Sequence, residues 1–370
     1  MSALATAWVE VDTDAIRHNY REIKRFVGPE VAVMAVIKTN GYGHGLELVA
    51  DTLKHEADWF GVSTIEEAAR LRSAAPTTPT LVFQPLRADT LDSLVEMDLT
   101  GTIDGEDGAD AIGMAAKAGR PGPDAHLKVD TGMSRYGIPW WDALAFYRSI
   151  AGNPGIRITG VYTHLATAPS PNTAATQEQL RRFADLTRDF GPDGTRLEVL
   201  HALNSAGILR FSNHRYSMVR VGTLLYGQYP PNVPHLLDLK PTWALKTRIV
   251  SVRPVLAGTS AGYGAEWTAK RPSRVATLPI GYADGPTLLP RSVWERESGV
   301  RALVKKLLGR NRMEVETPHG PAPVIGRVAS QSMMLDITDL PDVQLGDIVQ
   351  VPSRRLLVGE HIPRLPITTG

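Results

Sequence analysis

The chain has 370 residues, of which 43% are hydrophobic and 21% charged, and its formal net charge is +1. This balance offers no strong field to nucleic acid or anionic lipid, and the lack of cysteine excludes disulfides, thiolate nucleophiles and cysteine-ligated zinc. The sequence shows no basic-then-apolar leader and no apolar run of about 18 residues, the length of a membrane span. We therefore expect a soluble cytoplasmic protein, with two domains or one large barrel and an appendage.

Short apolar runs alternate with helical patterns through the first two-thirds of the chain. The runs lie at residues 8–12, 31–38, 59–63, 80–84, 101–104, 126–130, 158–165, 198–204 and 218–222. Such an alternation indicates βαβ units and a parallel sheet. Eight units over about 200 residues favour a TIM-type (β/α)8 barrel over an open sheet, and we expect this cofactor-binding barrel at 13–241.

The pattern changes after Pro241. Stretches such as SRVATLPIGYADG, APVIGRV and DIVQV predict strands separated by glycine and proline. We expect a β-rich second domain at 242–370, joined by a strand from residues 1–12. The charged stretch 291–312 is expected to be a surface insertion. The predicted fold class is α/β, an N-terminal (β/α)8 barrel with a C-terminal β-rich domain.

Polar side chains follow the predicted barrel strands, where barrel enzymes carry their active sites. This set comprises Lys38, Lys128, Asp130, Arg135, Thr163, His164, Asn204, Ser205, Arg220, Gly222 and Thr223. Taken alone, a strand-end lysine is usually a solvated charge, and a histidine after an apolar run is usually a packed rim residue. At successive strand ends the residues together indicate one site at the barrel mouth.

Seven sequence blocks, in order, carry a resemblance to a known family. They are VAVMAVIKTNGYGHG, HLKVDTGMSRYG, GVYTHLATA, HALNSAG, YSMVRVGTLLYG, SAGYGAEW and LPIGYADG. With these blocks the chain resembles the alanine racemases, pyridoxal-phosphate enzymes of the barrel fold type, over about residues 7–350. The resemblance implies a pyridoxal 5'-phosphate cofactor and the interconversion of L- and D-amino acids.

The resemblance also implies catalytic and phosphate-binding roles. Lys38 would hold the cofactor as a Schiff base and act on one face of the substrate α-carbon, and Tyr263 would act on the opposite face. The cofactor phosphate would be held by Tyr42, Ser205, Gly222 and Thr223, with Asn204 close by.

Further roles follow from the same resemblance. Arg220 would face the pyridine nitrogen, and His164 would hydrogen-bond to Tyr263 and Arg220. Arg135 would contact the substrate carboxylate and the phenolic oxygen of the cofactor. Lys128 matches a lysine that is carbamylated in many relatives and orients that arginine. In the family the tyrosine of the β domain reaches the barrel of the other subunit, so a homodimer with composite active sites is implied.

The chemistry agrees with these roles. Burial and nearby cations, for which Arg135 and Arg220 are candidates, lower the pKa of a lysine so that its amine can react. A phosphate needs backbone N–H groups free of bulky side chains, as at Gly222. Racemisation needs one acid–base group on each face of a planar carbon. Arginine stays protonated and so leaves the pyridine nitrogen opposite it unprotonated.

Two departures from the family pattern bear on the substrate. In GRVASQS, Ser330 stands where methionine is usual and Gln331 where aspartate is usual. No tyrosine follows Tyr282, although relatives carry one in a C-terminal segment that narrows the entrance. We count Ser330, Gln331 and Tyr282 with Arg135 as substrate-side residues. One hypothesis is a wider entrance and a substrate bulkier or more polar than alanine; the other is that these changes are neutral in an alanine racemase.

Other functions remain as alternatives. The chain could be a specialised pyridoxal-phosphate enzyme of a biosynthetic pathway with little racemase activity. Decarboxylases of this fold type use a catalytic cysteine, which is missing, and a glutamate where Arg220 stands. A lone cofactor-carrying barrel would lack the β domain. A metal-dependent aldolase would need clustered ligands, and the C-terminal histidines His319 and His361 are not at ligand spacing, so no metal is expected.

Overall fold

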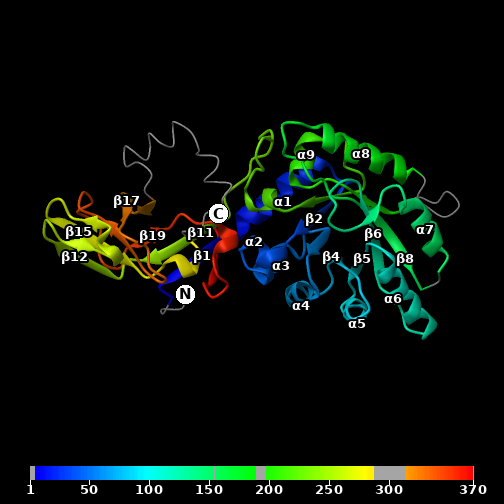
Figure 1. The fold of residues 1–370 in the computed structure, drawn as a ribbon, viewed down its shortest axis with the longest axis horizontal. Helices are drawn as coiled ribbons and strands as arrows, with labels where there is room; N and C mark the ends of the chain where they lie inside the picture. Colours follow the sequence, from blue (N-terminus) through cyan, green and yellow to red (C-terminus); the bar gives the residue numbers. More distant parts are fainter. Residues whose placement is uncertain (1–4, 154, 189–196, 287–312, 370) are drawn as a thin grey trace. The chain divides into compact units, whose positions relative to one another are not determined.

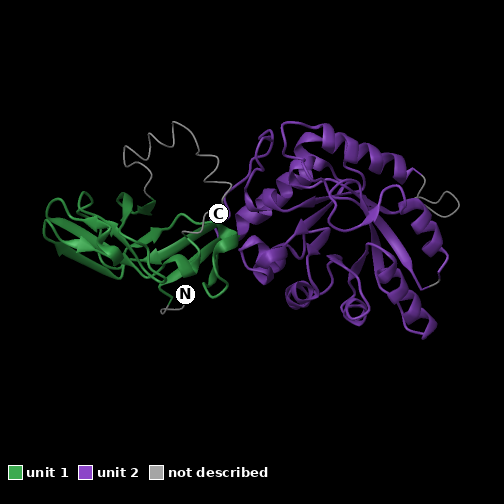
Figure 2. Ribbon diagram, in the orientation of Figure 1, with its two compact units in different colours: residues 1–12, 243–367 green, residues 13–242, 368–370 purple. Residues whose placement is uncertain are grey.

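The computed structural model describes residues 5–153, 155–188, 197–286 and 313–369. The chain forms two compact units, one of residues 1–12 with 243–367 and one of residues 13–242 with 368–370 (Figure 2). The surface insertion expected at 291–312 lies outside the described residues. Among the helices that are described, none has the length and apolar character needed to cross a bilayer.

The unit of residues 13–242 contains a closed ring of eight parallel strands within the described ranges (Figure 1). In ring order these are β2 (Ala32–Val36), β3 (Trp59–Val62), β4 (Thr80–Pro85), β5 (Thr100–Ile103), β6 (Asp124–Asp130), β8 (Arg157–Tyr162), β9 (Val199–His201) and β10 (Met218–Val221). Pairing of β5 with β6 and of β10 with β2 closes the ring. The two-residue strand β7 (Ile138–Pro139) adds to the end of β6. The predicted barrel is confirmed.

Helices follow the strands, as the alternating pattern predicts (Figure 1). They are α1 (Thr13–Val27), α2 (Lys38–Tyr42), α3 (Leu46–Leu53), α4 (Ile65–Ala74), α5 (Leu91–Glu96), α6 (Glu106–Lys117), α7 (Ala143–Ala151), α8 (Ala174–Thr187) and α9 (Ser205–Arg210). In α1 the buried Ile16, Tyr20, Ile23 and Val27 recur at three- and four-residue spacing, which places them on one face of the helix.

The barrel interior mixes apolar and polar side chains. Met34, Leu81 and Met218 pack with Tyr162 in one buried cluster. The Tyr162 ring stacks on His201, with centroids 4.8 Å apart and planes 16° apart. Polar groups this deep in a core usually have hydrogen-bond partners, and the hydroxyl of Tyr162 lies 3.0 Å from that of Thr102.

The unit of residues 243–367 with 1–12 is built on a nine-stranded sheet in the order β12-β15-β18-β17-β16-β19-β11-β1-β20. The bounds are β1 (Ala7–Asp12), β11 (Trp243–Arg248), β12 (Ser251–Val255), β15 (Ser273–Leu278), β16 (Glu314–Thr317), β17 (Gly320–Ile325), β18 (Met333–Asp336), β19 (Ile348–Gln350) and β20 (Arg364–Ile367), with a separate pair β13 (Ser260–Ala261) and β14 (Trp267–Thr268). The N-terminal strand β1 pairs antiparallel with β11 and parallel with β20. A β-rich second domain is therefore present.

Several barrel strands are shorter than the apolar runs predict. The run 31–38 forms a strand only to Val36, so Lys38 begins the next element and does not end the strand. The run 158–165 ends as a strand at Tyr162, and 198–204 ends at His201. The physical reason is that buried apolar residues continue past the last ladder hydrogen bond, because the turns at the barrel mouth are themselves packed.

Candidate active site

A cavity of about 840 Å³ lies in the barrel unit at the C-terminal ends of the strands. Its walls include Lys38, Tyr42, Lys128, Arg135, Tyr162, His164, Asn204, Ser205, Arg220, Gly222 and Thr223. Lys128, Tyr162 and Arg220 lie on β6, β8 and β10, and the others lie in the segments that follow β2, β6, β8, β9 and β10, which are far apart in sequence. The structure thus gathers the barrel residues that the sequence singled out around one space.

Lys38 starts a left-handed turn. Thr39, Asn40, Gly41 and Tyr42 all have φ between 52° and 61°. Each non-glycine residue in this conformation costs roughly 1–2 kcal/mol, so the turn must be held by its surroundings. Glycine alone does not provide this turn, because the non-glycine residues Thr39, Asn40 and Tyr42 share the strain.

Side chains outside the turn hold it. The Glu67 carboxylate accepts from the backbone N–H of Thr39 at 2.6 Å. The Asn40 side-chain oxygen accepts from the backbone N–H of Leu46 at 3.0 Å and from Arg70 at 2.9 Å. Because these partners belong to α3 and α4, the position of the reactive lysine depends on the helices around it.

His44 secures the same segment from the inside. It is fully buried, its Nδ1 lies 3.0 Å from the carbonyl oxygen of Gly41, and its Nε2 lies 2.8 Å from the hydroxyl of Thr242. Its ring also stacks on Tyr226 at 4.4 Å. The sequence pattern predicted no role for His44, although this residue lies between two glycines of the GYGHG segment that follows Lys38.

The Lys38 side chain is half-buried. Burial lowers the pKa of its amine, and the positive charge of Arg135 lowers it further, while Glu67 acts in the opposite direction. Arg220, the second expected cation, acts instead on Lys128 and His164. Burial is the larger cause of their lowered pKa values, and the charge of Arg220 lowers these values further. Lys38, like Lys128, is thus an amine at the cavity wall that loses its proton more easily than a free lysine.

A glycine-lined cradle forms where β10 ends, with the hydroxyls of Ser205 and Tyr42 beside the backbone of Gly222. The backbone N–H of Gly222 donates to the Ser205 hydroxyl at 3.1 Å. A Cβ on Gly222 would lie 2.5 Å from the Tyr42 hydroxyl, so only glycine fits there. Asn204 caps α9 by accepting from the Gly207 N–H at 3.0 Å. Hydroxyl groups and backbone N–H groups with no side chain in front of them suit an anionic group.

Arg220 is 4% exposed, and burial lowers its pKa to about 10, so it remains a cation at neutral pH. Its Nη2 donates to the carbonyl oxygen of Thr163 at 2.6 Å and lies 3.4 Å from Nδ1 of His164. His164 is neutral near pH 7 because burial and the charge of Arg220 hold its pKa well below the usual value. His164 is therefore placed to accept a hydrogen bond from the guanidinium.

Lys128 is 3% exposed, and its Nζ sits over the Tyr162 ring, 4.9 Å from the centroid. Burial lowers the pKa of this amine to about 7, helped by the charges of Arg220 and Arg135. A sizeable fraction of Lys128 is then neutral at physiological pH, the form of an amine that reacts with electrophiles.

The loop that carries Arg135 is fastened at its base. One Asp130 oxygen accepts from the N–H groups of Gly132 and Met133 at 2.9 and 2.8 Å, and both oxygens accept from Ser134. Partial burial raises the pKa of this carboxyl, but the three backbone donors lower it more, so the net shift is downward. Asp130 is thus a structural anchor, and Arg135 itself is exposed at the tip of the loop.

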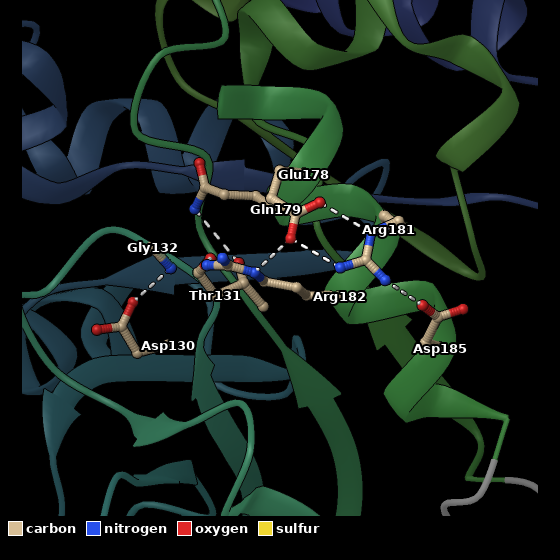
Figure 3. A network of polar contacts seen from close by, with 8 residues as sticks. All are labelled: Asp130, Thr131, Gly132, Glu178, Gln179, Arg181, Arg182 and Asp185. Atoms are coloured by element: carbon tan, nitrogen blue, oxygen red, sulfur yellow. Dashed lines mark hydrogen bonds and ion pairs between the residues drawn. The ribbon is translucent and has the colours of Figure 1, made fainter. Parts of the chain in front are cut away.

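Helix α8 supports that loop from the outside (Figure 3). Arg182 donates to the carbonyl oxygen of Thr131 at 3.0 Å and pairs with Glu178 at 2.9 Å. Gln179 donates to the Thr131 hydroxyl at 3.3 Å and to the carbonyl oxygen of His164 at 3.1 Å. Gln179 therefore ties the turn after β6 to the turn after β8, a role that the sequence pattern gave no means to foresee.

The expected residues of the β-rich unit lie on adjoining loops of that unit. The turn of Tyr282 is joined to the GRVASQS loop, because Tyr282 N–H donates to Ala329 and Ala283 N–H donates to Ser330, both at 3.0 Å. The Tyr263 loop contacts the same loop through an ion pair of Arg327 and Glu266. Ser330 and Gln331 are exposed, as are Tyr263 at 70% and Tyr282 at 52%.

The described part of the chain holds no group of three or more histidine, aspartate and glutamate side chains that could bind a metal ion. The short C-terminal segment instead supports the Tyr282 turn. Nε2 of His361 lies 2.9 Å from one oxygen of the buried Asp284, whose other oxygen accepts from Gly281 at 2.8 Å. His361 is thus a structural partner of the turn.

Comparison with known proteins agrees with the geometry. The family profile "Alanine racemase, N-terminal domain" matches residues 11–230, and "Alanine racemase, C-terminal domain" matches 242–360. The alanine racemase of Synechocystis sp. is 35% identical over 362 residues, which is 96% of this chain and 92% of the relative. "Alanine racemase 2" of Caldanaerobacter subterraneus is 37% identical over 346 residues, 93% of this chain and 84% of the relative.

Solved structures give the same result. The alanine racemase of Clostridium difficile superimposes with a TM-score of 0.88 at 25% identity, covering all of this chain and 97% of the other. The fold, the cavity at the strand ends and the similarity across both units thus all indicate the same family. The chain belongs to the alanine racemase family and is a pyridoxal-phosphate-dependent amino-acid isomerase.

Proposed function

We propose that this enzyme racemises alanine, with Lys38 and Tyr263 as the two groups that move the α-proton. The observation that carries the proposal is the half-buried Lys38 amine, whose pKa is lowered by burial and by Arg135, beside a glycine-lined cradle. The near-full-length similarity to proteins named alanine racemase supports alanine as the substrate.

The cavity fits the cofactor. The hydroxyls of Tyr42 and Ser205, which line the cavity with Gly222 and Thr223, would hold its phosphate, and the missing side chain at Gly222 lets the Tyr42 hydroxyl approach the backbone there. Arg220, a buried cation, would face its pyridine nitrogen. When bound through Lys38, pyridoxal phosphate supplies the electron sink that makes an α-proton acidic. Because Arg220 keeps the ring nitrogen unprotonated, that sink is weakened, which disfavours transamination.

Each protein group has one task in this proposal. On one face Lys38 takes the α-proton as the neutral amine or returns it as the ammonium, and on the other Tyr263 gives it as the hydroxyl or takes it as the phenolate. Arg135 holds the substrate carboxylate, and His164 hydrogen-bonds to Tyr263. Carbamylation of Lys128 would create an anion to orient Arg135, and the pKa of about 7 favours the neutral amine, the form that attacks carbon dioxide and then loses a proton. A carbamate signal in 13C NMR after incubation with 13C-bicarbonate tests this modification.

We further propose a homodimer in which Tyr263 completes the site of the partner barrel, in the cytoplasm, whose reducing conditions suit a chain without cysteine. The exposure of Tyr263, 70% within its own chain, supports a task at another surface. Mixing Lys38→Ala with Tyr263→Phe subunits tests this. Composite sites would leave one intact site in each mixed dimer and restore about a quarter of wild-type activity. Sites built within one chain would restore none.

Ser330, Gln331 and Tyr282 set the substrate range in this proposal. Replacing an acceptor-only carboxylate by the Gln331 amide changes both charge and hydrogen bonding. The decisive experiment incubates the enzyme with each L-amino acid in deuterated water and follows α-exchange by NMR. Exchange of alanine supports the proposal. Exchange of larger or more polar amino acids at rates similar to that of alanine would support the hypothesis of a wider entrance. Exchange of alanine far faster than that of every other amino acid would contradict it.

The same experiment examines the second candidate, a specialised pyridoxal-phosphate enzyme with little racemase activity. The changes at Ser330 and Gln331 favour it, because they alter a loop beside both tyrosines. Binding of the cofactor without exchange of any amino acid would support this candidate and contradict the racemase proposal.

A further inference from the structure

Two buried histidines lie beneath Arg220 and have no task in the proposed reaction. His126 on β6 and His201 at the end of β9 are both 0% exposed. Nη1 of Arg220 lies 2.8 Å from Nδ1 of His201, and Nε2 of His201 lies 3.0 Å from Nδ1 of His126. The three side chains form a line that runs down into the barrel core.

The arginine sets the direction of this line. A guanidinium only donates, so Nδ1 of His201 accepts and its proton must stand on Nε2. That Nε2–H donates to Nδ1 of His126, which places the remaining proton of His126 on its own Nε2. Among the described residues, this last N–H has no hydrogen-bond partner. The tautomers of both rings therefore follow from one fixed charge.

The ends of the guanidinium are fully occupied by protein. Nη1 donates to the ring and to the carbonyl oxygen of His201, and Nη2 donates to the carbonyl oxygens of Thr163 and Ala202 and has Nδ1 of His164 at 3.4 Å as a longer contact. For Nε, the described residues supply no acceptor. Nε–H is thus the donor that Arg220 has left for the cavity, and its direction depends on how firmly Nη1 and Nη2 are held.

Space is reserved for the terminal ring. A Cβ on Gly160 would lie 2.7 Å from Cδ2 and Nε2 of His126, so a larger residue on β8 would expel the imidazole. The His126 ring also meets His201 edge-on at 5.0 Å and Trp59 at 5.5 Å. A buried donor without a partner costs free energy that an apolar side chain of the same size would not. This cost suggests that the acceptor nitrogen of His126 matters.

Both imidazoles stay neutral across the working pH range. Burial lowers the pKa of His126 to about 3, and the charge of Arg220 contributes. Burial, Arg220, His126 and Lys128 hold the pKa of His201 well below its usual value. The line is a fixed set of hydrogen bonds and does not switch near neutral pH.

We propose that His126 is a positioning residue for Arg220: through His201 it fixes the orientation of the guanidinium so that Nε–H faces the ring nitrogen of the cofactor. The inference rests on the proposed role of Arg220. This role of His126 requires a hydrogen-bond acceptor for His201 at position 126, whereas a role in core packing alone would require only a side chain of similar volume.

Two variants separate these requirements. His126→Asn keeps an acceptor close to the place of Nδ1 but loses volume, whereas His126→Leu keeps more volume and removes the acceptor. We expect His126→Leu to raise the cofactor dissociation constant and to lower kcat by about 10-fold each, with KM changed less than about 2-fold. His126→Asn should remain within about 3-fold of wild type. Equal losses in the two variants, or a larger loss in His126→Asn, would overturn the proposal.

A spectroscopic test does not depend on activity. Long-range 1H–15N NMR of the 15N-histidine-labelled holoenzyme should show both His126 and His201 neutral, with the proton on Nε2. His126→Leu should alter the Nε2–H signal of His201, and His126→Asn should retain it. A proton on Nδ1 of His201 would contradict the proposal. If the enzyme has no racemase activity but shows the expected tautomers, the result counts against the proposed reaction and not against the role of His126. If His126→Leu does not fold, the His201 tautomer in the wild-type spectrum and the His201 signal in His126→Asn still test the proposal.

Discussion

The two units of this chain prepare their functional groups in opposite ways. In the barrel unit, Lys38, Lys128 and Arg220 are wholly or partly buried, and their pKa values are all shifted downward by burial. In the β-rich unit, Tyr263 and Tyr282 stand on exposed loops. The barrel therefore sets the pKa values of its groups by burial within one fold, whereas the two tyrosines of the β-rich unit are exposed to solvent within the chain. Variants in each unit should accordingly fail in different ways.

The largest effect is expected from Lys38→Ala in the barrel. Loss of the amine removes both the covalent attachment of the cofactor and one of the two proton carriers, so kcat/KM should fall at least about 10,000-fold. The absorbance band of the lysine-bound cofactor should disappear. Lys270→Ala, at an exposed lysine of the other unit, should leave the band and the activity intact. A surviving band in Lys38→Ala would show that another lysine carries the cofactor.

Tyr263→Phe is the matching change in the β-rich unit. It should lower racemisation about 100- to 10,000-fold while the cofactor band stays, because only a proton carrier is lost. In deuterated water, single-turnover α-exchange should persist for one enantiomer and vanish for the other. Leu256→Ala, at an exposed residue of the same unit, is the control and should keep exchange of both enantiomers. Equal loss of exchange for both enantiomers in Tyr263→Phe would contradict the two-base mechanism.

Gly222→Ala tests the pre-formed cradle. The added Cβ would meet the Tyr42 hydroxyl at 2.5 Å, and such overpacking costs roughly 1–3 kcal/mol. Cofactor affinity, measured by equilibrium dialysis, should therefore drop about 10- to 100-fold. Gly105→Ala, where a Cβ meets nothing within 4 Å, should bind the cofactor normally.

The smallest effect concerns stability and the charge of Lys128. Its folded-state pKa is about 7, below the value of about 10.4 for an unfolded lysine, so the folded chain binds fewer protons between these values. The free energy of unfolding should therefore rise with pH across this window, and the gain is lost as pH falls toward 7. Lys128→Met should reduce the slope by up to about 1.4 kcal/mol per pH unit.

Urea unfolding in bicarbonate-free buffer measures this slope. Below pH of roughly 6 the lysine is protonated in both states, so the curves of wild type and Lys128→Met should run parallel there, which serves as the internal control. Parallel curves above pH 7 as well would mean that the folded protein keeps Lys128 charged.

Much of the fold was predictable because it depends on local pattern. Alternating apolar runs and helical segments identified the barrel, and the change after Pro241 identified the β-rich part. Strand ends were less accurate, since Lys38 and His164 follow their strands by two residues. Apolar character reports burial, and residues at the barrel mouth are buried without being paired in the sheet.

Part of the site escaped prediction because it depends on side-chain direction and distant partners. His126 lies two residues before Lys128 on β6, so the period of a strand places both side chains on the inner face, and this signal was available. Its bond to His201, 75 positions away, was not. The left-handed turn at Thr39 and Asn40 could not be predicted either, because neither residue type favours that conformation strongly enough over others.

The sequence by itself determined the family and the cofactor and predicted which lysine would hold that cofactor, because ordered blocks of residues at strand ends carry that information directly. Only the tertiary structure decided the state of those residues. The reactivity of Lys38, the neutrality of His164 and the direction of the Arg220 line arise from burial and from charges brought together by barrel closure. A pKa depends on the surrounding dielectric and on nearby charges, and both exist only once the chain has folded.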